Sequence, residues 1–110
     1  MKPSFYPTRA HLLLCTGSSC RQRGAQELLA GLRVELESRF WAYYRAGGNL
    51  RLTASGCLGA CSFGPTLAVY RPEGPEVQAW YYAATLPLAL RVAEAARSGQ
   101  PWPQERRFGA

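Results

Sequence analysis

The sequence of 110 residues lacks aspartate and isoleucine altogether and contains one histidine and one lysine. Its seven acidic residues are glutamates scattered along predicted helices and turns, so they form no carboxylate pair, catalytic triad or phosphate-binding loop. Hydrolysis and group transfer are therefore not expected. His11 opens a predicted strand several residues before the nearest cysteine, which favours a structural or exposed position over a ligand role. We predict a protein that is not an enzyme.

Long apolar runs are also missing. The longest, Leu12–Cys15 and the interrupted run Ala83–Leu90, fall far short of the ~20 residues of a transmembrane helix. The first ten residues contain Lys2, Arg9 and two prolines, unlike the apolar centre of a signal peptide. We therefore expect a cytoplasmic protein that has no membrane partner.

The composition is that of a globular protein, with 47% hydrophobic and 18% charged residues. Because the length is near the commonest domain size, we predict one domain over residues 1–110, with an irregular tail from about residue 100. The net charge of +6 comes from twelve arginines and one lysine against the glutamates, without a basic run. This charge favours docking with acidic proteins, although a solvated basic surface explains it equally well.

The first half of the chain has the pattern of a β-α-β unit. The short apolar segment His11–Leu14 predicts a buried strand with Cys15 at its carboxyl end. From Gln22 onward, apolar residues recur every three or four positions, which predicts a helix that ends at Gly47–Gly48. The alternating segment Leu50–Thr53 then predicts a strand parallel to the first, because a helix of crossover length lies between them.

The second half predicts a hairpin and a final helix. Two β-prone segments, residues 66–70 and 77–82, flank a loop that is too long for a two-residue turn. Thr85 then resembles an N-cap, Pro87 fits the first helical turn, and Gly99 ends the pattern. The predicted fold class is α/β, in the order β-α-β-β-β-α, with a mixed four-stranded sheet flanked by two helices.

All four cysteines fall in two short loops that follow the parallel strands. Cys15 and Cys20 are separated by four residues, Cys57 and Cys61 by three, and the pairs by thirty-six. The carboxyl ends of parallel strands meet at one edge of a sheet, so four thiolates are expected to converge there. A 2Fe-2S cluster requires two thiolates on each iron, and the glycines near the cysteines allow the backbone to approach such a cluster closely.

Other chemistry uses similar cysteine pairs. Structural zinc tolerates two to four intervening residues, so spacing alone leaves zinc and iron-sulfur equally open. Thioredoxin-type exchange needs two intervening residues, which neither pair has. A plant-type ferredoxin needs a further cysteine at position 23, where this chain has Arg23. The alternative to an iron-sulfur protein is thus a zinc-stabilised structural or nucleic-acid-binding module.

The motifs around the cysteines resemble those of the thioredoxin-like 2Fe-2S ferredoxins, a family related to the small iron-sulfur subunit of respiratory complex I. Cys15 and Cys20, followed by Arg21-Gln-Arg-Gly24, resemble the first ligand pair of that family. Gly56-Cys-Leu-Gly-Ala-Cys61 resembles the second pair, and Trp80-Tyr81 resembles its aromatic last strand.

The resemblance implies a thioredoxin-like fold and one 2Fe-2S cluster, with Cys15 and Cys20 on one iron and Cys57 and Cys61 on the other. It implies a one-electron carrier that forms a homodimer, exchanges electrons with redox partner proteins and does not bind nucleic acid. The short first loop is closer to the complex I subunit, so a cluster-bearing subunit of a larger oxidoreductase is a second alternative.

Overall fold

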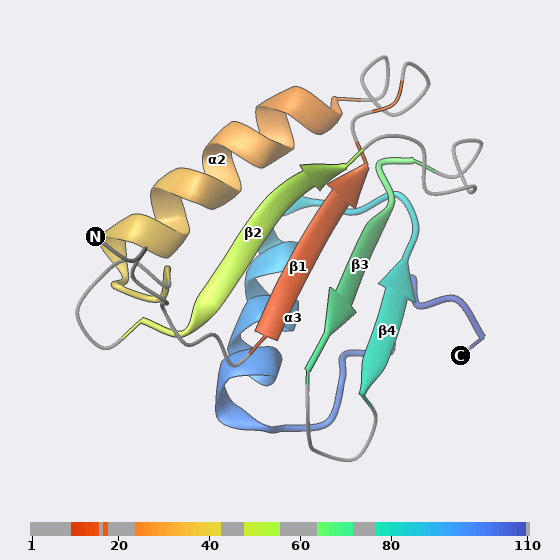
Figure 1. The fold of residues 1–110 in the computed structure, drawn as a ribbon. Helices are drawn as coiled ribbons and strands as arrows, with labels where there is room; N and C mark the ends of the chain where they lie inside the picture. Colours follow the sequence, from red (N-terminus) through yellow and green to blue (C-terminus); the bar gives the residue numbers. More distant parts are fainter. Residues whose placement is uncertain are drawn as a thin grey trace, which may run out of the picture.

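The computed structural model describes residues 10–15, 17, 24–42, 48–55, 64–71 and 77–109. Six elements follow one another in the order β1 (Ala10–Cys15), α2 (Ala25–Ser38), β2 (Leu50–Ser55), β3 (Leu67–Tyr70), β4 (Gln78–Tyr81) and α3 (Leu86–Ser98) (Figure 1). This order confirms the β-α-β-β-β-α prediction. Neither helix of the described residues has the length and apolar character that crossing a membrane requires.

The four strands form one mixed sheet in the order β2-β1-β3-β4. β1 and β2 are parallel, whereas β3 is antiparallel to both β1 and β4. The parallel register places Cys15 beside Ser55, and the antiparallel register places Leu14 beside Leu67. The carboxyl ends of β1 and β2 and the beginning of β3 therefore share one edge of the sheet.

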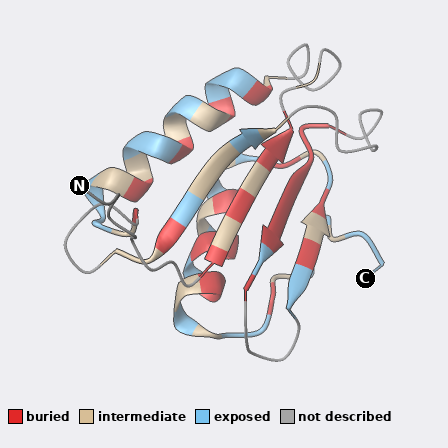
Figure 2. Ribbon diagram, viewed as in Figure 1, coloured by how far each residue is buried: buried red, intermediate tan, exposed pale blue. Residues whose placement is uncertain are grey.

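Both helices cover the same face of the sheet. Leu12 and Leu14 of β1 are fully buried in one core that both helices enter. α2 supplies Leu28, Leu32 and Leu36 to this core, and α3 supplies Leu88, Val92 and several alanines. The helices also meet each other, since a β-carbon added at Gly31 of α2 would lie 3.4 Å from Leu86 of α3. In Figure 1, α3 lies behind the sheet, and Figure 2 shows the buried residues concentrated on β1, β3 and the inner sides of the helices.

The end of α2 differs from the prediction. We predicted a helix up to Gly47–Gly48, but α2 ends at Ser38. The chain turns at Phe40, which has a left-handed φ of 58°. Trp41 then donates to the Leu36 carbonyl at 2.9 Å and accepts hydrogen bonds from Asn49 and Leu50 at 3.1 and 2.9 Å. Hydrogen bonding to the start of β2 therefore replaces further helix, although the apolar spacing continues.

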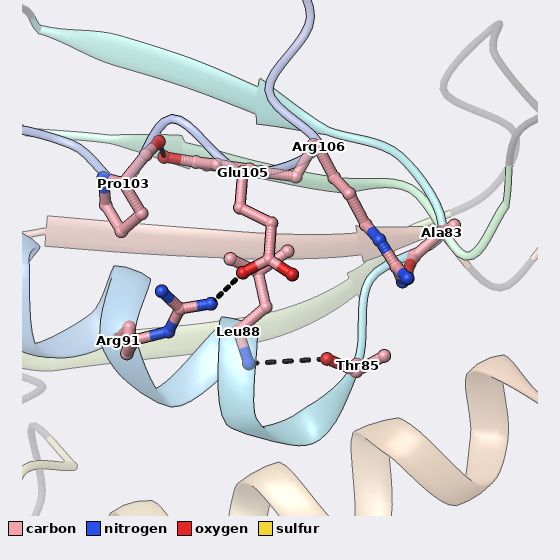
Figure 3. A network of polar contacts seen from close by, with 8 residues as sticks. Ala83, Thr85, Leu88, Arg91, Pro103, Glu105 and Arg106 are labelled. Atoms are coloured by element: carbon pink, nitrogen blue, oxygen red, sulfur yellow. Dashed lines mark hydrogen bonds and ion pairs between the residues drawn. The ribbon is translucent and has the colours of Figure 1, made fainter.

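The ends of α3 agree with the prediction. Thr85 is the N-cap, and its hydroxyl accepts a hydrogen bond from the Leu88 backbone N–H at 3.4 Å (Figure 3). Gly99 closes the helix with a left-handed φ of 72°, a conformation that glycine adopts without steric cost. Arg91 on the outer side of α3 contacts Glu105.

Residues 99–109 contain no helix or strand of their own but run along the edge of β4. Tyr82 donates to the Arg106 carbonyl at 3.0 Å, and Phe108 donates to the Trp80 carbonyl at 2.8 Å. The hydroxyl of the buried Tyr81 donates to the Pro103 carbonyl at 2.8 Å. Around these bonds, Arg107 forms an isolated antiparallel β-bridge with Tyr81, which extends the sheet beyond β4.

Arg71 connects the sheet to the end of α3. It follows β3, is 3% exposed, and donates hydrogen bonds to the carbonyls of Ala95 at 3.1 Å and Gln100 at 2.7 Å. Its guanidinium also lies 3.8 Å from the ring centroid of Trp102. A cation therefore sits at the negative end of the helix dipole, where it is stabilising.

Candidate metal centre

The candidate centre is built at the sheet edge where β1 and β2 end. Cys15 is the last residue of β1 and is fully buried. Its backbone N–H donates to the Thr66 carbonyl at 3.0 Å, just before β3 begins. Ser55 ends β2 in register with Cys15. The first ligand candidate is thus fixed by strands on both sides.

The other three predicted ligands, Cys20, Cys57 and Cys61, lie outside the described residues. Among the described residues, no three His, Cys, Asp or Glu side chains come together as a metal site. The residues that flank the two cysteine loops are described. Gly24, four positions after Cys20, precedes α2, whose first turn lies at the same end of the sheet as the end of β1 (Figure 1).

The described surroundings of Cys15 fit an anionic iron-sulfur group. A buried thiol is a soft ligand, and it binds iron as the thiolate. The positive end of the α2 dipole favours negative charge at this end of the sheet. Gly24 has a φ of 92° and caps α2 without a side-chain hydrogen bond, and Glu27 is the acidic residue of the first helical turn.

His11 lies on the same strand but bonds elsewhere. Its Nε2 is 2.7 Å from the Thr53 hydroxyl on β2. Desolvation by partial burial and the nearby Arg51 lower the pKa of His11 below its ordinary value of 6.5. The ring therefore favours the neutral form and joins β1 to β2, in agreement with the structural role expected from the sequence.

Sequence reasoning gave Thr66 and Arg71 no role at this site or in the core. Thr66 is fully buried, and its carbonyl fixes the backbone of Cys15. A backbone contact of this kind leaves no signal in the residue type. Arg71 was placed in the predicted loop between the hairpin strands, yet it is buried against Trp102. The burial of an arginine depends on a partner thirty-one positions away, which no local pattern indicates.

Comparison with known proteins identifies the family. The family model of the thioredoxin-like [2Fe-2S] ferredoxins matches residues 6–79, which is more than half of the chain. The chain belongs to this family. It is also 31% identical over 87 residues to a putative 2Fe-2S ferredoxin of Priestia megaterium, covering 79% of this chain but only 60% of that protein.

Solved structures agree on the fold. A thioredoxin-like [2Fe-2S] ferredoxin from Aquifex aeolicus superimposes with a TM-score of 0.69 at 20% identity, covering 94% of this chain and 99% of that one. A second structure of a thioredoxin-like [2Fe-2S] ferredoxin from that organism gives a TM-score of 0.64 at 22% identity, with 86% of each chain covered. The thioredoxin-like fold class is confirmed, and family membership confirms the 2Fe-2S cluster as the cofactor type. The family consists of iron-sulfur electron carriers.

Proposed function

We propose that this chain is a one-electron carrier that holds a single 2Fe-2S cluster on Cys15, Cys20, Cys57 and Cys61. By resemblance to the family, Cys15 and Cys20 would hold one iron, and Cys57 and Cys61 the other. The observation that supports this ligand set best is the register of β1 and β2. It puts the first cysteine beside the residue from which the second cysteine loop departs.

The length of the chain restricts how far apart these residues can be. Cys57 follows Ser55 by two residues, which span at most about 7 Å when fully extended. Neighbouring strands lie about 4.8 Å apart, so the Cα atoms of Cys57 and Cys15 are within roughly 12 Å of each other. Cys61 precedes Gly64 by three residues, which is a reach of about 11 Å from the segment that leads to Thr66. The second loop is therefore short enough for its two thiolates to reach Cys15.

The bound cluster would supply a centre that accepts and releases one electron, and the protein would supply ligands, burial and docking. Because Cys15 is buried, solvent has little access to its sulfur, and solvent access is one of the factors that set the reduction potential of a cluster. The Cys15 N–H is already bonded to Thr66, so backbone donors to the cluster would come from the loops. We propose no substrate chemistry for the protein itself.

The decisive experiment is anaerobic purification followed by metal analysis. We expect two irons and two acid-labile sulfides per chain, a brown colour that bleaches on reduction, and an electron paramagnetic resonance signal from the reduced protein. Replacing any one of the four cysteines by serine should change that signal or abolish the cluster, whereas the control His11→Gln should leave it unchanged. A colourless protein with one zinc would contradict the proposal and support the zinc-stabilised module.

We further propose a homodimer that exchanges electrons with separate redox partner proteins in the cytoplasm, where cysteines stay reduced. Sedimentation equilibrium checks the oligomeric state, because a monomer has a mass of 12.1 kDa and a dimer has twice that. Co-purification in fixed ratio with a larger oxidoreductase would instead show a subunit of that enzyme.

A further inference from the structure

The face of the sheet opposite the helices has no helix over it in the described residues. Because side chains alternate along a strand, the residues between the core positions point to this face. The strand registers arrange them in three rows across the sheet. The rows are Arg51-His11-Tyr70-Gln78, Thr53-Leu13-Ala68-Trp80, and, on β1 and β2 alone, Ser55-Cys15. We call these positions, together with Tyr82 and Phe108 beside β4, the open face.

Aromatic side chains gather on the side of the open face that β3 and β4 form. Tyr70 and Tyr82 are 37% and 38% exposed, and Phe108 is 37% exposed. The rings of Tyr82 and Phe108 meet edge to face with their centroids 5.4 Å apart. Trp80 is partly buried and pairs across the strands with Ala68, which is fully buried. Aromatic residues of this exposure are enriched in protein interfaces.

The open face has positive charge and no carboxylate. The four strands contain no acidic residue at all. In the described part of the chain, the glutamates lie on α2 and α3, apart from Glu105, which contacts Arg91 of α3. Arg51 is exposed at one side of the open face. Arg106 is exposed beyond β4, where its guanidinium already donates to the Ala83 carbonyl at 2.7 Å.

The open face also leads to the candidate centre. Cys15 follows the core residue Leu14, so its side chain belongs to the open face. Each row is about 6.6 Å from the next, because two strand residues separate them. Leu13 and Trp80 are thus one row from Cys15, and His11 and Tyr70 are two rows from it.

We propose that the open face is the docking surface for an acidic redox partner protein. This inference rests on the proposed function, because it requires that an electron be delivered through this face. An acidic surface complements Arg51 and the net charge of +6, whereas a second copy placed on the same face would bring two surfaces of like charge together. The half-exposed aromatic rings supply the apolar contact that an interface centre needs.

The test uses the full cluster-loaded protein and a small acidic b-type cytochrome as the probe. In the reaction, the dithionite-reduced protein loses one electron and the ferric haem gains it, and stopped-flow spectroscopy gives the rate constant. Arg51→Glu should lower this rate constant about tenfold at low salt, and Arg51→Gln should lower it less. The matched control Arg33→Glu makes the same charge change on the exposed side of α2 and should alter the rate less than about twofold. High salt should remove the difference.

Amide chemical-shift mapping of the isotope-labelled protein with the same cytochrome localises the contact. We expect shifts at Leu13, Tyr70 and Gln78 but not on α2. Equal effects of Arg51→Glu and Arg33→Glu, or shifts confined to the helices, would overturn the proposal. A dimer that buries this face and dissociates in the Arg51→Glu variant would also overturn the proposal. If the protein held no iron, none of the variants would reduce the cytochrome. That result would refute the proposed function, and it differs from the result that overturns the docking proposal, in which all variants reduce the cytochrome at similar rates.

Discussion

Replacing Arg71 by methionine should destabilise the fold without changing the metal centre. Methionine keeps an unbranched apolar stem but removes the guanidinium that donates to Ala95 and Gln100. It also removes the cation from the face of Trp102, 3.8 Å away. The end of β3 at which Arg71 lies is opposite to the end that meets Cys15, so the effect should be confined to stability.

The expected loss follows from these contacts. Two hydrogen bonds from a charged donor contribute about 1.5–3 kcal/mol each, and a partly desolvated cation–π contact about 1–2 kcal/mol. The stabilisation that these contacts give the folded state is partly offset by the cost of burying the guanidinium. The loss in Arg71→Met is also smaller because the Ala95 carbonyl still accepts hydrogen bonds from the backbone N–H groups of Gly99 and Gln100. We expect a net loss of about 2–4 kcal/mol.

Urea unfolding followed by circular dichroism measures this loss. With a slope of about 1.5–2 kcal/mol per molar urea, the midpoint should fall by roughly 1–2.7 M. Arg39→Met is the matched control, since Arg39 pairs with Glu35 at the surface and should contribute less than about 1 kcal/mol. A loss below about 1 kcal/mol in Arg71→Met would refute the reasoning, because the buried charge would then cost as much as its contacts contribute. An altered visible spectrum would contradict the separation from the centre.

Three further changes have defined outcomes. Thr85→Ala should lower the free energy of unfolding by about 1 kcal/mol because the Leu88 N–H loses its cap, and Thr85→Ser should restore it in thermal unfolding. Gly31→Ala should raise the free energy of unfolding by about 0.5–1 kcal/mol, since the new methyl group only touches Leu86 at 3.4 Å; a lower urea midpoint would show that this contact is a clash. Because the pKa of His11 is lowered in the folded state, the unfolded chain binds a proton at His11 more readily than the folded chain does. The stability that neutral His11 contributes is therefore present above pH 6.5 and lost as the pH falls below 6.5. His11→Gln should flatten this dependence in urea titrations between pH 7.5 and about 5, and an unchanged slope would show that another group is responsible.

The sequence by itself determined the order of the elements and the position of Cys15 at the end of β1. Local signals were sufficient where the structure depends on local physics. Thr85 and Gly99 bound α3 because a hydroxyl acceptor and a left-handed glycine act within one turn of the helix. Cys15 ends β1 as predicted because a short apolar run is long enough for a buried strand. The β-α-β order with a crossover helix also made the parallel pairing of β1 and β2 predictable.

Tertiary structure decided what depends on partners far away in the chain. The periodicity of α2 continues past Ser38, but hydrogen bonds between Trp41 and the start of β2 end the helix there, and no local pattern records that competition. The burial of Arg71 depends on Ala95, Gln100 and Trp102, which come together only when α3 folds back onto the sheet. The placement of both helices on one face likewise arises from their shared core, and it leaves the other face without a helix over it in the described residues. A side chain's environment is set by what packs against it, and packing is a property of the whole fold.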